Sequence, residues 1–177
     1  MTLSDLASIG SFISALAVLV SLVYLGLQVR QTEKNQKALI QQGRAARIAD
    51  SVLQISEALR TVAFVKGQNG DETMSVVELT QFRLIFRSMM ISAEDSHFQY
   101  GENLLSEKAY ESLVASMKFM LVAPGLRAMW AETRDMYEPS FKAFVDQVMR
   151  ETQSAPPVDE LARWKANLAA VKSLATR

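Results

Sequence analysis

The feature that most constrains this chain is a run of uncharged residues near its start. No Asp, Glu, Lys or Arg occurs between Asp5 and Arg30, and most residues of that run are apolar. As a helix, residues 6–29 would be about 36 Å long, whereas the hydrocarbon core of a bilayer is about 30 Å thick. Serines within the run are tolerated, because a hydroxyl can bond back to a carbonyl of its own helix. The sequence therefore predicts one transmembrane helix, against the alternative of a buried helix in a soluble protein.

Basic residues follow this run and predict its orientation. Arg30, Lys34 and Lys37 come soon after it, whereas the N-terminus before it carries only Asp5. A signal peptide begins with a basic segment, so cleavage is not expected here. The positive-inside rule places the N-terminus outside the membrane and residues 30–177 in the cytoplasm. The three basic residues are also candidates for contact with lipid headgroups, or serve only as the topology signal.

Composition limits the chemistry of the chain. Its 177 residues allow one compact domain and an anchor, and the absence of cysteine excludes disulfides and thiolate metal sites. Acidic residues outnumber basic ones in residues 67–160, and much of the basic excess lies beside the apolar run. This distribution favours a membrane surface over a nucleic acid as the partner.

One face of the predicted transmembrane helix carries small residues. Gly10, Ser14, Ala17 and Ser21 follow one another at intervals of three or four, so they share one helical face. Small residues let the backbones of two membrane helices approach closely. The stripe predicts self-association through this face, and the alternative is a monomeric anchor with incidental small residues.

The remaining sequence reads as helical, with clear signals for where helices begin. Helical spacing of apolar residues continues from the membrane to about Val65 as a stalk. The segment from Ser75 to Glu78 matches a capping box, and the helix that it opens is apolar on most sides, which predicts a central, buried helix. Ser106, Pro124 and Pro139 mark three later starts.

These signals predict an all-α protein with one N-terminal transmembrane helix, a stalk helix and a cytoplasmic bundle of about five further helices. The expected divisions are an anchor in residues 1–29, a stalk in 30–66, a helical domain in 67–153, and a linker with an amphipathic helix in 154–177. Pro156 and Pro157 form the linker.

Glu94 and His97 are the first candidate site. Their E-x-x-H spacing puts both side chains on one helical face, as in di-iron proteins, but such centres need a second histidine. The chain has one histidine, so a metal site of that kind would have to be shared between subunits. No nucleophile elbow and no phosphate-binding loop is present. We therefore expect no cofactor and no enzymatic activity, and interpret the pair as a polar cluster inside a bundle.

Arginines around Trp130 are the second candidate site. Arg127, Trp130 and Arg134 have spacings of three and four residues, so the indole can stack on both guanidinium groups. With Arg87, Glu94 and His97 they could form a site for a small anion or a lipid headgroup. The structural alternative is a tryptophan wedged between helices with arginines covering its edge.

Nine methionines further suggest an adaptable core or groove.

Two segments carry a resemblance to a known family. One is the run from Pro124 to Trp130 of the form P-G-x-R-x-x-W, continued by Tyr137-Glu-Pro-Ser-Phe and Phe144-Val-Asp, and the other is the apolar span that ends in Gln-Val-Arg-Gln. In these the chain resembles a widespread, uncharacterised bacterial family of short single-span membrane proteins, over most of residues 10–150. The resemblance implies a protein of the bacterial inner membrane and assigns no activity.

The function predicted first is that of a membrane-anchored interaction or scaffold protein that forms a homo-oligomer. The stripe of small residues, the stalk and the lack of catalytic groups favour it. The alternative is a membrane-associated sensor that binds a small anionic ligand or a lipid headgroup. An enzyme with a metal shared between subunits is the third possibility. Membrane lipid and a second copy of the chain are the expected partners, and nucleic acid is not.

Overall fold

The computed structural model describes residues 3–156 and 159–175, and in these the chain is helical without a strand. The helices are α1 (Leu3–Ile55), α2 (Ala58–Gln68), α3 (Val76–Gly101), α4 (Glu107–Met120), α5 (Pro124–Thr133), the 3-10 turn η1 (Arg134–Met136), α6 (Pro139–Glu151) and α7 (Glu160–Ala175). Their contacts divide the chain into two compact units, residues 1–43 and 44–177. The predicted all-α class is confirmed. Pro157 of the predicted linker lies outside the described residues.

The stalk helix does not continue unbroken to Val65, as the sequence had predicted. α1 ends at Ile55, and Glu57 has an extended backbone with φ −62° and ψ 133° before α2 begins. The Thr61 hydroxyl donates to the Ile55 carbonyl at 2.8 Å and satisfies an acceptor freed at the end of α1. Because neither glycine nor proline marks the break, the spacing of apolar residues could not reveal it.

The predicted start of α3 is confirmed. The Glu78 amide donates to the Ser75 hydroxyl at 3.2 Å, and the Glu78 carboxylate accepts from the Ser75 amide at 2.8 Å. The same carboxylate accepts a hydrogen bond from Lys66 at 2.7 Å, which joins α2 to α3. The hydrogen bonds from Lys66 and then from Ser75 lower the pKa of Glu78 to about 2.

One face of α3 is buried, rather than most of it. Phe82, Phe86 and Met90 on this face are at most 2 % exposed. On another face Leu84 and Ile91 remain 62 % and 50 % exposed. The predicted central position is confirmed, because α3 contacts α2, α4, α5 and α6, but the prediction that the helix is buried was wrong for the face that carries Leu84 and Ile91.

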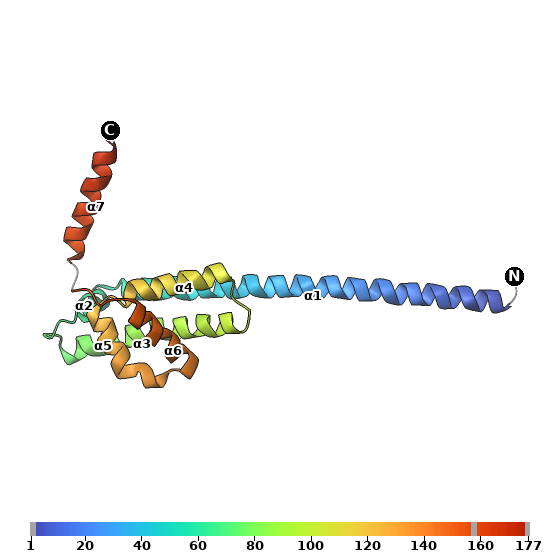
Figure 1. The fold of residues 1–177 in the computed structure, drawn as a ribbon, viewed down its shortest axis with the longest axis horizontal. Coiled ribbons are helices and arrows are strands. Elements are labelled where there is room, and N and C mark those ends of the chain that lie inside the picture. The colour runs from blue at the N-terminus through green and yellow to red at the C-terminus, as the bar shows by residue number, and fades with distance from the viewer. Residues whose placement is uncertain (1–2, 157–158, 176–177) are drawn as a thin grey trace. The chain divides into compact units, whose positions relative to one another are not determined.

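The later helices begin where the sequence indicates. Ser106 caps α4 through its hydroxyl, and Pro124 and Pro139 occupy the first turns of α5 and α6. A proline there removes no intrahelical hydrogen bond. Figure 1 shows α3, α4, α5 and α6 together in the unit that follows Gly43. Their core includes Phe82, Phe86, Met90, Leu113, Met117, Leu126, Met129, Trp130, Phe141, Val145 and Val148.

Glycines allow α2 and α5 to meet closely. A Cβ added at Gly125 would lie 1.6 Å from the carbonyl oxygen of Gly67, and one added at Gly67 would lie 2.2 Å from the ring of Phe82. Both distances are far below van der Waals contact. The Pro-Gly pair at 124–125 thus starts α5 and also removes the side chain that would push α5 away from α2.

Candidate functional site

The apolar first part of α1 is the candidate membrane anchor. The large apolar side chains between Gly10 and Val29 are all exposed, from 53 % at Leu16 to 70 % at Phe12. α1 is long and apolar enough to cross a membrane, and its most apolar stretch is not buried inside the structure. An apolar surface of this extent in water would be a strong aggregation hazard. Burial in a bilayer would cover it.

A second helical segment meets the same test of length and composition but is better explained as core. α4 and the segment from Pro124 to Met136 would form one span only with a bend of 108° between them. Their buried side chains include Leu113, Met117 and Trp130. These side chains belong to the core of the bundle, although Phe119 on α4 and Met136 after α5 stay exposed.

The serines of the small-residue stripe are satisfied within α1. The Ser14 hydroxyl donates to the Gly10 carbonyl at 2.9 Å, and the Ser21 hydroxyl donates to the Ala17 carbonyl at 2.8 Å. No hydroxyl of the stripe therefore enters lipid without a partner. The stripe stays available as a surface of small residues that another helix can approach.

The basic residues after the anchor are exposed in the structure. Arg30, Lys34 and Lys37 all lie on α1 in the first unit. Lys37 pairs with Glu33 at 2.9 Å, and its hydrogen bond and charge lower the pKa of that carboxyl. Arg30 and Lys34 leave two cations beside the apolar segment, where anionic headgroups would attract them.

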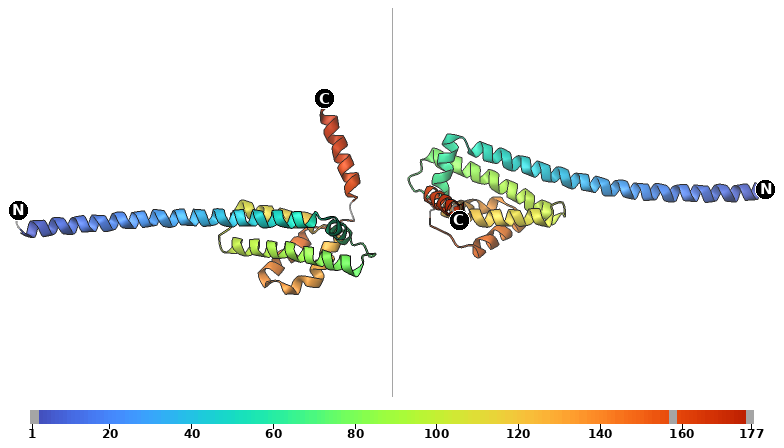
Figure 2. Two further views of the ribbon diagram at one scale, coloured as in Figure 1. Left: turned by 180° about the vertical axis from the view of Figure 1, so that it is seen from behind. Right: turned by 90° about the horizontal axis from the view of Figure 1, so that it is seen from above.

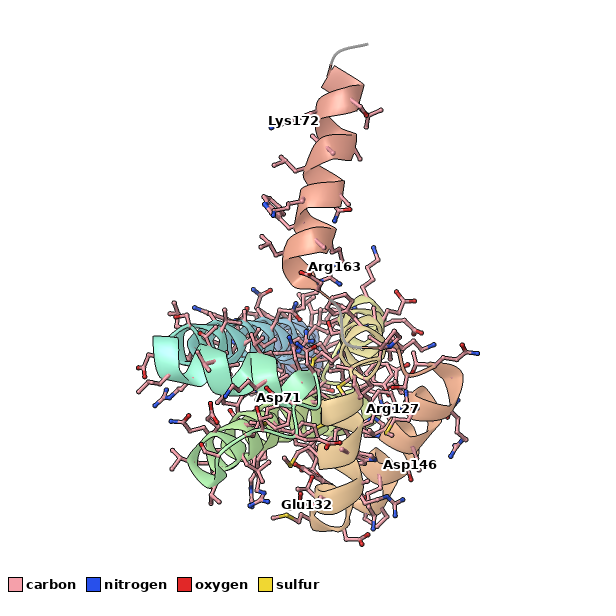
Figure 3. All side chains as sticks on the ribbon, turned by 90° about the vertical axis from the view of Figure 1, so that its left-hand side faces the viewer. Asp71, Arg127, Glu132, Asp146, Arg163 and Lys172 are labelled. Atoms are coloured by element: carbon pink, nitrogen blue, oxygen red, sulfur yellow. The ribbon has the colours of Figure 1, made fainter. Side chains whose placement is uncertain are left out.

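Arg127 binds carbonyl groups at the ends of two helices and does not line an open site. Its guanidinium donates to three carbonyls, those of Leu121 at 2.9 Å, Met149 at 2.6 Å and Thr152 at 2.9 Å. These carbonyls lie at the C-terminal ends of α4 and α6, where no helical partner remains for them. Figure 3 shows Arg127 on the side of the bundle where α5 and α6 meet. Its donors are used within the chain, which fits the structural alternative.

Trp130 and Arg134 share one carboxylate, that of Asp146 on α6. The Trp130 Nε1 donates to one oxygen of Asp146 at 2.9 Å, and Arg134 donates to the other. Burial raises the pKa of Asp146, but the hydrogen bonds from Arg134 and Trp130 outweigh it and the pKa lies below its ordinary value. The indole stacks on Tyr137 at 5.3 Å between centroids. The structure thus places tyrosine, instead of the expected arginines, against the ring.

Glu94 and His97 lie in one groove but have separate partners. The Glu94 carboxylate accepts the Glu138 amide at 2.8 Å and fixes the start of α6 on α3. The Nδ1 of His97 lies 2.9 Å from the hydroxyl of Tyr110, and its ring stacks on Phe144 at 4.9 Å. Burial lowers the pKa of His97, partly opposed by the charge of Glu138. These contacts are those of a neutral histidine at the edge of an aromatic core.

The groove beside His97 measures about 620 Å³ and is lined by residues from Ile91 to Glu102 and by the start of α6. Three of its carboxylates have partners: Glu94 accepts the Glu138 amide, Asp95 pairs with Arg47, and Glu138 caps α6 through the amides of Ser140 and Phe141. Within the described residues, no group of three or more His, Cys, Asp or Glu is placed to hold a metal ion. The serine of the groove, Ser140, donates its hydroxyl to the Glu138 carboxylate.

Arg87 is not part of a joint site with Arg127. It lines a groove with Arg47, Asp50 and Asp95 between α1 and α3, and its charge also acts on the hydroxyl of Tyr137. The six residues expected to form one ligand site therefore divide among separate interactions. Sequence reasoning did not identify Asp146 and Tyr110 as the partners, because the contacts join different helices and no local spacing marks them.

Comparison of the chain with protein families, with curated proteins and with solved structures gives no match.

Proposed function

We propose that this protein is a membrane-anchored helical interaction protein that forms a homo-oligomer. The observation that carries the proposal is the exposed apolar part of α1, which needs lipid or another helix to cover it. The contacts of Arg127, Trp130 and His97 support it indirectly, because the candidate chemical groups are used in holding the bundle together.

Two surfaces support self-association. The first is the stripe of Gly10, Ser14, Ala17 and Ser21, whose members leave room for a second helix. The second is a row of exposed apolar side chains on α3, where Val77, Leu84, Ile91 and Phe98 recur every seven residues and are at least 50 % exposed. Paired helices use two apolar positions in every seven residues, and this row supplies one of the two.

We also propose that the anchor lies in a bacterial inner membrane with the N-terminus outside and the helical bundle in the cytoplasm. The basic residues after the apolar segment support this orientation. Membership in the uncharacterised bacterial family that the sequence resembles stays a prediction. The alternative function is a membrane-associated sensor that binds a small anionic ligand or a lipid headgroup near Arg87, Glu94, His97, Trp130 and Arg134. It is less well supported, because Glu94, Trp130 and Arg134 have partners within the chain.

The test compares the association of the full chain with that of the double variant Gly10→Leu and Ala17→Leu. Leucine side chains on the stripe would hold two helices apart, so the apparent dissociation constant should rise by about tenfold or more, equivalent to about 1.4 kcal/mol. Molar mass by light scattering in mild detergent over a range of protein concentrations measures this. The double variant Ser11→Leu and Ala15→Leu, off the stripe on the same helix, is the matched control.

Two results would contradict the proposal. A wild-type chain that is monomeric in detergent and in lipid vesicles has no homo-oligomer to explain. Equal molar masses for the wild type and the stripe variant would remove the stripe as the interface. In that case Ile91→Glu tests the α3 row, with Glu102→Gln, at the exposed C-terminal end of the same helix, as its control.

A further inference from the structure

A partly open apolar cavity of about 280 Å³ lies within the second unit. It is enclosed by the C-terminal part of α1, the middle of α3 and the second half of α4. Figure 2 shows these three segments side by side. The apolar lining includes Ile48, Val52 and Ile55 from α1, Met89 from α3, and Met117 and Met120 from α4. Methionine side chains adapt to different apolar shapes, so this lining suits a flexible chain. None of the interactions described above uses this cavity.

A guanidinium without a carboxylate partner lines the same cavity. The Nε of Arg44 donates to the hydroxyl of Ser96 at 3.1 Å, and Ser96, 1 % exposed, donates onward to the Ser92 carbonyl at 2.9 Å. Among the described residues, the terminal nitrogens of Arg44 have no hydrogen-bond partner, and no carboxylate forms an ion pair with it. Arg47, one turn later, has such a partner in Asp95. Arg44 therefore offers two donor nitrogens, with four N–H groups, beside an apolar space.

We propose that this cavity binds an amphiphile with one apolar chain and an anionic head, whose head bonds to the free nitrogens of Arg44. The planar guanidinium can donate two parallel hydrogen bonds to a carboxylate or a phosphate. The apolar chain lies among the isoleucine, valine and methionine side chains. A volume of about 280 Å³ lies at the small end of ligand sites, so it holds one chain rather than a whole phospholipid.

The entrance is formed by exposed residues of α1 and α4. Val52 is 61 % exposed, and Ser116 on α4 is also exposed and lines the cavity. The apolar chain of the amphiphile can therefore enter the cavity without unfolding of the bundle. The binding site does not depend on the self-association proposed above, because every residue that forms it belongs to one chain after Gly43. The site adds a ligand for the helical domain to the proposed function.

Photo-crosslinking tests the site in the full chain, reconstituted into nanodiscs of zwitterionic lipid. The probe is decanoate with a diazirine at the end of its chain, and peptide mass spectrometry locates the adducts. We expect adducts on α3 near Met89 and on α4 near Met117. Ser116→Trp fills the entrance and should reduce this labelling at least fivefold. Ser112→Trp, one turn earlier on the exposed face of α4 and outside the lining, is the matched control and should label as the wild type does.

A charge variant tests the role of Arg44. Arg44→Gln should reduce decanoate labelling about tenfold, because a hydrogen bond to a charged group is lost. Labelling by the matching photo-reactive alcohol, which has no charge, should not change. Arg47→Gln removes the same charge one turn away and should leave decanoate labelling as it is.

A second probe distinguishes a free fatty acid from a membrane lipid as the source of the bound acyl chain. This probe is a phosphatidylglycerol with the diazirine on one acyl chain. Adducts from decanoate alone indicate a free carboxylic acid, and adducts from the lipid probe indicate the chain of an anionic lipid; either supports the site. Adducts confined to residues 10–29 with both probes would overturn it, because they report partition into the membrane only. Equal labelling of Ser116→Trp and Ser112→Trp would overturn it as well.

Discussion

Replacing Gly125 with alanine is expected to destabilise the helical bundle by about 3 kcal/mol or more, the upper end of the usual cost of overpacking. The new Cβ would lie 1.6 Å from the carbonyl oxygen of Gly67. That neighbour is backbone, so no side-chain rotation relieves the clash and α2 and α5 must separate. Separation exposes Phe82 and Leu126, which are 2 % and 1 % exposed in the bundle. Guanidinium unfolding followed by circular dichroism measures the loss.

Gly101→Ala is the control for this change. A Cβ there meets nothing within 4 Å, and Gly101 is the last residue of α3. Alanine favours a helix over glycine by up to about 1 kcal/mol, so this variant should be equally stable or slightly more stable than the wild type. Equal stability of Gly125→Ala and Gly101→Ala would contradict the close approach of α2 and α5.

The second large effect is expected for Trp130→Ala, with a loss of about 3–5 kcal/mol. Trp130 is 1 % exposed and packs on Tyr137 and Phe141. Its removal leaves a cavity in the core and takes one hydrogen bond from Asp146. A loss of this size is a large fraction of the 5–15 kcal/mol that stabilises a typical domain. Thermal unfolding should therefore begin well below that of the wild type.

The other tryptophan of the chain provides the control. Trp164 lies on α7 and is 62 % exposed, so Trp164→Ala should change the free energy of unfolding by no more than about 0.5 kcal/mol. If both variants lose the same stability, the core position of Trp130 is wrong. Phosphate is a probe for the alternative anion site around Trp130. If Trp130→Ala binds phosphate more weakly than the wild type but is equally stable, the indole binds a ligand and does not stabilise the core.

The starts of the helices could be predicted because their signals are local. Ser75 with Glu78, Ser106, Pro124 and Pro139 each act on the first turn of the helix that follows. The end of α1 could not be predicted, since neither glycine nor proline marks it and the hydroxyl that satisfies the Ile55 carbonyl comes from Thr61 on the next helix. The exposed face of α3 was missed for a related reason. Apolar residues on several faces do not say which face another helix covers.

The residues that carry the family resemblance are explained by packing. Pro124 starts α5, Gly125 admits α2, Arg127 closes the ends of α4 and α6, and Trp130 bonds to Asp146. The sequence indicated that these residue types belong together. Their role depends on carbonyls and a carboxylate from elsewhere in the chain, which spacing within the motif cannot show. The cavity beside Arg44 was missed likewise, because three helices form it.

The anchor and its orientation are tested most directly by single cysteines in this cysteine-free chain. Ser4→Cys lies before the apolar segment, and Ser154→Cys lies after α6. A membrane-impermeant maleimide is added to spheroplasts of a bacterial host. It should label Ser4→Cys in intact spheroplasts and Ser154→Cys only after lysis. Label on Ser154→Cys in intact cells, or release of the wild-type chain from membranes by an alkaline carbonate wash, would contradict the account.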